Sequence, residues 1–200
     1  MKNKDWTGNT HSTMVLTGAS GHALNDREEH DYYATEPKAL ELLLEKETFS
    51  NVWEPACGGG HLAEVLKEKN ILGKATDLID RGYGTGNVDF LDVLQTEPWD
   101  GDIITNPPYK FAQEFIEKSL SLIPDGRKVA MFLRIQFLEG KSRGRMFAKY
   151  PPKVIYVSRT RLKCALGGDF DAMTGSSATC YAWYVWEKGW EGDTIIRWIN

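Results

Sequence analysis

The stretch Asp102-Ile103-Ile104-Thr105-Asn106-Pro107-Pro108-Tyr109 decides the fold of this chain. Its first half is a short apolar run, which predicts a buried strand. The double proline cannot continue a strand ladder, so the backbone must leave the sheet there. Asn106 and Tyr109 are therefore expected on a stiff loop just beyond the carboxyl end of a strand. In open α/β sheets, ligands bind at that edge.

Strand and helix patterns alternate on both sides of this loop. Further strands are predicted at 51–54, 71–77, 129–133, 154–157 and 179–186. Helices are predicted after Pro37, with Thr35 as the N-cap, after the glycines at 58–60, after Tyr109, and up to Lys149. This order favours an α/β domain with a mostly parallel central sheet.

The segments outside these elements set the expected domain limits. Residues 1–30 are rich in Gly, Ser, Thr, Asn and charge, which indicates a flexible arm before one domain over 31–200. Residues 159–178 are expected to form a long loop, and 189–200 a short docked tail.

A glycine-rich turn follows the strand predicted at 51–54. Gly58, Gly60 and Ala63 fit the dinucleotide fingerprint, and Asp77 follows at about the right distance. An acid at the end of a strand can accept hydrogen bonds from both hydroxyls of a ribose. Taken alone, this fingerprint leaves a nicotinamide-dependent oxidoreductase open.

Composition limits the class of protein. No apolar run approaches the roughly 20 residues that cross a bilayer, and no apolar segment follows the basic N-terminus. The three cysteines lack metal-ligand spacing, so no metal site is predicted and reduced thiols in a cytoplasmic setting are expected.

Charge is unevenly distributed along the chain. The net charge is −4, yet the stretch 141–163 holds eight Lys and Arg residues and no acid. A local basic face on an acidic protein is typical of a nucleic-acid footprint. A solvated helix with scattered lysines explains the pattern as well. The residues expected to bind nucleic acid are Arg143, Arg145, Arg159, Arg161 and Lys163.

The motif Asn106-Pro107-Pro108-Tyr109 resembles the catalytic motif of amino-methyltransferases that use S-adenosylmethionine (SAM). The resemblance implies that the Asn106 side-chain oxygen and the Pro107 carbonyl accept hydrogen bonds from an exocyclic NH2 group. It also implies that Tyr109 stacks on the planar substrate. A simple turn of Asn and Pro is the structural alternative.

The flanks of the glycine turn add to this resemblance. Glu54-Pro55-Ala56-Cys57-Gly58-Gly59-Gly60 resembles the SAM-binding loop of adenine-specific methyltransferases. The resemblance implies that Glu54 lies near the methionine ammonium, Asp77 at the ribose and Asp89 with Phe90 at the adenine. The cofactor-binding residues it implies are Tyr33, Thr35, Glu54, Ala56, Cys57, Gly58, Gly60, Asp77, Asp89 and Phe90.

Together the motifs imply the seven-stranded SAM-dependent methyltransferase fold, with an antiparallel strand near the C-terminus. The implied activity is methyl transfer from SAM to N6 of adenine in DNA, which leaves S-adenosylhomocysteine. RNA adenine methylation, glutamine methylation of a protein and SAM binding without turnover remain alternatives. The chain has no room for a full target-recognition domain, so residues 136–178, or a partner, would supply recognition.

Overall fold

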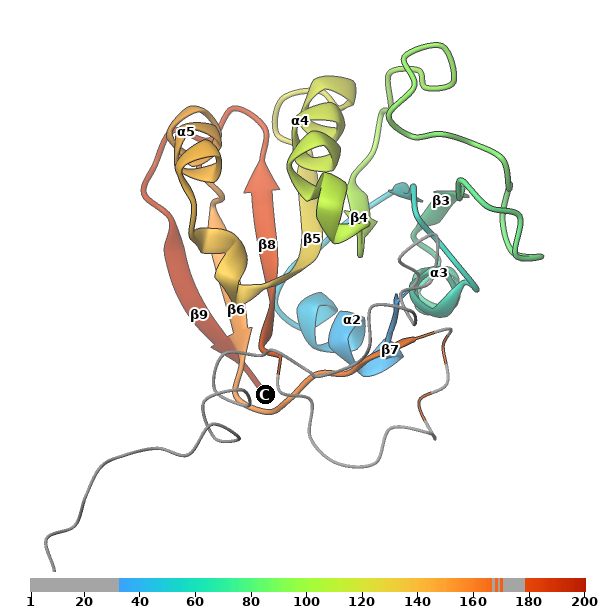
Figure 1. Ribbon diagram of the computed structural model, residues 1–200, viewed down its shortest axis with the longest axis horizontal. Helices are drawn as coiled ribbons and strands as arrows, with labels where there is room; N and C mark the ends of the chain where they lie inside the picture. The colour runs from blue at the N-terminus through green and yellow to red at the C-terminus, as the bar shows by residue number, and fades with distance from the viewer. Residues whose placement is uncertain (1–32, 167, 169, 171–178) are drawn as a thin grey trace, which may run out of the picture.

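The computed structural model describes residues 33–166, 168, 170 and 179–200 (Figure 1). The expected flexible arm at 1–30 lies outside the described residues. No helix of the described part is long and apolar enough to cross a membrane.

Nine strands and four α-helices make up the described part of the chain. The strands are β1 Tyr33–Thr35, β2 Val52–Glu54, β3 Leu72–Ala75, β4 Ile103–Thr105, β5 Lys128–Arg134, β6 Val154–Ser158, β7 Cys164–Leu166, β8 Tyr181–Glu187 and β9 Ile195–Ile199. The helices are α2 Pro37–Leu44, α3 His61–Glu68, α4 Ala112–Leu122 and α5 Lys141–Lys149, with short 3₁₀ turns η1 Tyr109–Phe111 and η2 Ile135–Leu138.

Seven of the strands form one sheet, in the order β3-β2-β4-β5-β8-β6-β9. Neighbouring pairs are parallel except those of β8, which runs antiparallel to β5 and to β6. The expected seven-stranded, mostly parallel sheet with an antiparallel strand near the C-terminus is therefore confirmed. Because β4, β5 and β6 run the same way, Asn106, Arg134 and Arg159 all follow strand ends at one edge.

Helices cover both faces of this sheet (Figure 1). In β5, Ala130 and Phe132 face a core shared with α2 and α3, whereas Val129, Met131 and Leu133 face a core shared with α4 and α5. All five are buried, because helices cover both faces of the strand, and for that reason its sequence is one continuous apolar run. Such a three-layer arrangement leaves the carboxyl edge of the sheet open for a site.

Three sequence expectations need correction. Thr35 does not cap α2, because its backbone is paired with Cys164 in a two-stranded β1–β7 ladder and Glu36 holds the N-cap position. The loop expected at 159–178 is interrupted by β7 for the same reason. The expected docked tail at 189–200 contains strand β9, which pairs with β6 and leaves Ile195, Ile196 and Trp198 exposed at the sheet edge.

Candidate active site

A cavity of about 500 Å³ opens at the carboxyl edge of the sheet. This volume lies within the range of small-molecule and cofactor pockets. Five separate parts of the chain contribute to its wall: β1, the glycine turn, the segment after β3, the segment 88–91 and the loop after β4. The predicted site residues that line it are Tyr33, Thr35, Glu54, Ala56, Cys57, Asp77, Asp89, Phe90, Asn106, Pro107, Pro108 and Tyr109.

Glu54 lies at the end of β2 with 2% of its surface exposed. Its Oε2 atom is buried without a hydrogen-bond partner. Burial, and then the nearby Asp77 carboxylate, raise the pKa of Glu54 well above its usual range. The Ala63 backbone N–H hydrogen-bonds to the carboxylate and partly offsets that rise. A buried carboxylate with one oxygen left without a partner at a cavity is stabilised by a cationic ligand.

The glycine turn is held by Asp77. The Gly58 backbone N–H donates to Asp77 Oδ2 at 2.7 Å, and the Ile79 N–H donates to Oδ1 at 2.9 Å. Arg81 lies 4.0 Å from the same carboxylate. Gly58 and Gly60, also predicted to bind the cofactor, do not line the cavity. Both have a positive φ and shape the turn, of which the residues before Gly58 do line the cavity.

Gly60 occupies a position that only glycine fits well. Its φ is +87°, and a Cβ there would lie 2.4 Å from the Tyr83 ring. Tyr83 therefore closes the outer side of the turn, a contact that the sequence pattern did not indicate. Cys57 is buried beneath it with a pKa raised to about 12 by burial, so its thiol stays neutral.

Asp89 and Phe90 follow at the far side of the cavity. Asp89 Oδ1 accepts the Leu91 N–H at 2.9 Å, which fixes the turn that carries both residues. Phe90 is 2% exposed and packs its ring on Trp53 at 5.2 Å and on Phe115 at 4.9 Å. The Phe90 side chain is thus part of the core and of the cavity wall at once.

The loop after β4 presents one unused acceptor. Asn106 Nδ2 donates to the Tyr33 carbonyl at 2.8 Å, while Asn106 Oδ1 is buried without a partner. Because the amide nitrogen is engaged by β1, the oxygen is the atom left for a ligand. The loop can therefore accept a hydrogen bond from an N–H group that enters the cavity.

Tyr109 is held on several sides. Its hydroxyl lies 3.6 Å from Cys164 Sγ, its ring stacks on Tyr181 at 6.1 Å, and the Arg134 guanidinium lies over it at 5.0 Å. Burial raises the pKa of Tyr109 well above its usual range. The neutral ring is thus fixed as a wall of the cavity.

Sequence reasoning missed several residues of this site. His61, Ile79, Arg81, Leu91 and Lys110 line the cavity, and Cys164 on β7 contacts Asn106 and Tyr109. Lys110 directly follows the Asn106 motif and Arg134 directly follows the strand predicted at 129–133, so their place at the carboxyl edge of the sheet could have been predicted. The place of Cys164 could not have been predicted, because its pairing partner Thr35 is 129 residues away in sequence.

The five basic residues predicted for nucleic acid do not line the cavity. Arg159 and Arg161 follow the carboxyl end of β6, at the same edge as the cavity, and Arg161 bonds to Cys180 Sγ. The Lys163 backbone N–H donates to Glu36. Arg143 lies over the Phe137 ring at 5.2 Å, and Arg145 is exposed on α5.

Neither family models nor curated protein sequences match this chain. Solved structures do match its fold. A protein of Agrobacterium tumefaciens predicted to be an O-methyltransferase aligns with a TM-score of 0.56 at 13% identity, over 82% of this chain and 85% of that one. A protein of Listeria monocytogenes described as a class I SAM-dependent methyltransferase aligns with a TM-score of 0.54 at 14% identity. The alignment covers 81% of this chain and 62% of that one.

The M protein of the type I restriction enzyme EcoKI aligns with a TM-score of 0.51 at 16% identity, over 77% of this chain and 44% of that one. The chain has the Rossmann-like fold of SAM-dependent methyltransferases. It spans less than two thirds of the Listeria protein and less than half of the EcoKI protein. At these identities the likeness shows the fold, and the substrate must be argued from the site.

Proposed function

We propose that this protein transfers a methyl group from SAM to the exocyclic N6 of adenine in DNA. The observation that carries the proposal is the Asn106 amide, whose oxygen is buried in the cavity without a partner. An exocyclic amino group is the complementary donor. The fold is that of enzymes that use SAM, and the motif Asn106-Pro107-Pro108-Tyr109 resembles that of amino-methyltransferases.

The cavity fits this cofactor in charge as well as in volume. SAM carries a sulfonium and an ammonium, and three carboxylates line the cavity: Glu54, Asp77 and Asp89. Glu54, whose buried Oε2 atom has no partner, would hold the ammonium, and Asp77 would hold the ribose hydroxyls. Asp89 and Phe90 would contact the adenine. When bound, SAM supplies an electrophilic methyl group that needs no metal.

The catalytic loop supplies orientation. Asn106 Oδ1 and the Pro107 carbonyl would accept the two hydrogens of the amino group, which withdraws the nitrogen lone pair from the ring and directs it outward. Tyr109, held by Cys164, Tyr181 and Arg134, would stack on the base. These residues act by fixing geometry and excluding water, and no strong base is required.

A duplex base must leave the helix to reach such a cavity. Single-stranded DNA and RNA present the same amino group at a lower cost, so RNA adenine is the second candidate. The same loop geometry also suits a glutamine side chain of a protein. The glycine turn beginning at Glu54 differs from the Asp-x-Gly-x-Gly-x-Gly pattern usual in those enzymes, which favours a base.

The test is transfer of labelled methyl from SAM to duplex DNA, single-stranded DNA, RNA and total protein in parallel reactions. Label in DNA that exceeds label in the other three supports the proposal. Label confined to RNA or to protein would replace it by that alternative. SAM binding without label in any acceptor would reject turnover by this chain alone and point to a partner that supplies recognition.

The basic stretch gives a second prediction. Changing Arg143, Arg145, Arg159 and Arg161 together to glutamine is expected to weaken DNA binding and to flatten its salt dependence, because each lost phosphate contact lowers the slope of log K against log salt by about 0.9 in duplex DNA. Fluorescence anisotropy between low and physiological salt measures the slope. A slope equal to that of the wild type would show that these arginines are only solvated surface.

A further inference from the structure

The charges around the cavity change sign between its interior and its mouth. The interior carries three carboxylates, Glu54, Asp77 and Asp89, and one cation, Arg81, which lies 4.0 Å from Asp77. Lys110 and Arg134 flank Tyr109 at the catalytic end. Both cations belong to the carboxyl edge of the sheet, one on the Asn106 loop and one at the end of β5. Neither belongs to the basic stretch 141–163.

Lys110 and Arg134 are available to a ligand. Both side chains are on exposed residues, and neither takes part in an ion pair with the residues that the structure describes. Lys110 Nζ lies 5.2 Å from the centre of the Phe111 ring, and the Arg134 guanidinium 5.0 Å from that of Tyr109. One side of the Arg134 guanidinium interacts with the Tyr181 hydroxyl. The five N–H groups of a guanidinium leave others of Arg134 for contact with phosphate.

We infer that Lys110 and Arg134 bind the phosphates next to the nucleotide whose base enters the cavity. This inference rests on the proposed function and names the surface through which that site takes a nucleic acid. The sugar-phosphate backbone of an extruded base must pass the rim that Tyr109 forms. An acidic protein with a net charge of −4 needs cations at that point to attract a polyanion.

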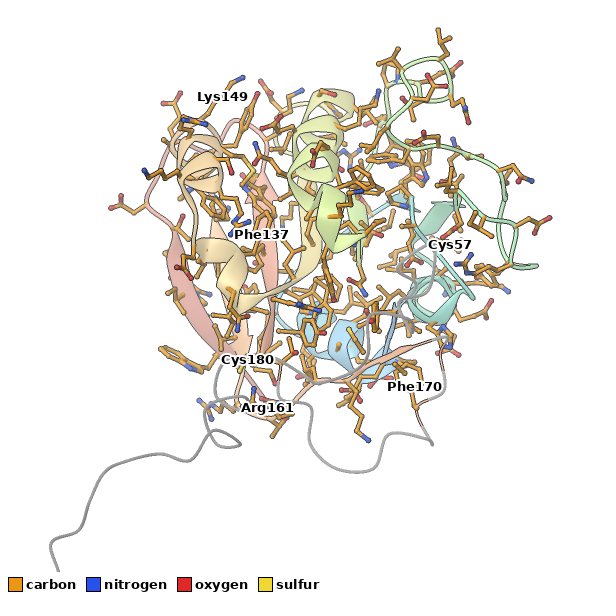
Figure 2. The ribbon with its side chains drawn as sticks, viewed as in Figure 1. Cys57, Phe137, Lys149, Arg161, Phe170 and Cys180 are labelled. Carbon is orange, nitrogen blue, oxygen red and sulfur yellow. The ribbon has the colours of Figure 1, made fainter. Side chains whose placement is uncertain are left out.

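The opposite edge of the sheet offers a matched control. Lys149 ends α5 at the far side of the molecule from Arg161 (Figure 2), but it lies in the basic stretch 141–163 and is left unchanged. Lys69 follows α3, whose first residue, His61, lines the cavity, so Lys69 lies at the end of that helix away from the cavity. Lys46 precedes Glu47, which pairs with Lys128 at the start of β5. Lys46 and Lys69 are exposed, and changing both removes the same charge as changing Lys110 and Arg134.

The experiment compares the wild type with Lys110→Gln/Arg134→Gln and Lys46→Gln/Lys69→Gln. Binding of labelled single-stranded and duplex DNA is measured across salt concentrations. The rim variant is expected to bind about tenfold more weakly, with a salt slope lower by about 1.4 on single strands and about 1.8 on duplex. The control variant is expected to keep the slope of the wild type.

A third variant, Lys110→Arg/Arg134→Lys, separates the effect of the two positive charges on DNA binding from the effect of the Arg134 side chain packing on Tyr109. It keeps both charges, so its salt slope is expected to equal that of the wild type. Equal losses in the rim and control variants would overturn the inference, because the effect would then follow net charge alone. A slope lost in the charge-retaining variant would overturn it too.

Two results distinguish this inference from the proposed function. Transfer of methyl to DNA by the wild type, with an unchanged slope in the rim variant, would overturn the inference and leave the function standing. Failure of the wild type to bind or methylate any nucleic acid would overturn both.

Discussion

Replacing Asn106 with alanine is expected to abolish methyl transfer while SAM affinity stays nearly unchanged. The change removes the buried Oδ1 acceptor and the bond from Nδ2 to the Tyr33 carbonyl. Loss of one oriented hydrogen-bonding group in an active site typically lowers kcat by about 10²- to 10³-fold, and here a second effect adds to it because the base is no longer oriented.

Two measurements on Asn106→Ala separate these roles. Single-turnover transfer of labelled methyl reports the chemistry, and titration calorimetry with SAM reports the cofactor site. A large loss of SAM binding would show that Asn106 supports the fold of the cavity instead of the substrate. Transfer within about threefold of the wild type would contradict the assigned role.

The second large effect is expected at Glu54. Glu54→Gln keeps the shape of the side chain but removes the charge, so SAM affinity is expected to fall by about a hundredfold or more. The free protein should at the same time become more stable at neutral pH, since a buried carboxylate with one oxygen lacking a partner is costly to ionise. Calorimetry and thermal unfolding measure the two changes on one sample.

The pKa of Glu54 gives this prediction a pH dependence. Its pKa in the folded protein is raised, so the stability of the wild type is highest below the unfolded pKa of about 4.3 and falls as pH rises toward the folded value. Glu54→Gln is expected to lack that fall. SAM affinity of the wild type should rise over the same interval, because the ammonium binds the ionised form.

Opposite outcomes would exclude this role for Glu54. Equal SAM affinity in Glu54→Gln and the wild type would show that this carboxylate does not bind the ammonium of SAM. A matched control is Glu47→Gln, because Glu47 is a partly buried carboxylate at the other edge of the sheet and pairs with Lys128 at 2.6 Å. It is expected to lower stability without changing SAM affinity.

The local parts of the site could be predicted from the sequence because their signals are local. Two prolines end β4 beside Asn106, and glycines open the turn before α3, so each motif fixes its own geometry. These motifs meet at the cavity because the parallel strands that they follow end at the same edge of the sheet. For the same reason Asp77, which follows β3, lines the same cavity as Asn106. Asp89 reaches the cavity from the connection between β3 and β4.

The parts that could not be predicted depend on distant pairing. The sequence around Thr35 predicts a helix cap, and only its pairing with Cys164 shows that it is in a strand. That ladder brings the Tyr33 carbonyl to Asn106 and so selects which amide atom faces the cavity. Likewise β9 forms because β6 offers a free edge, which no local pattern in 189–200 reveals.

The most direct test of the central claim is to identify the methylated nucleoside. DNA incubated with the protein and labelled SAM is digested to nucleosides, which are separated and identified by mass spectrometry, with Asn106→Ala as the control. The account predicts label in N6-methyldeoxyadenosine with the wild type and none with the variant. Label on a cytosine, on a ring carbon or on the protein fraction, or equal label with Asn106→Ala, would contradict it.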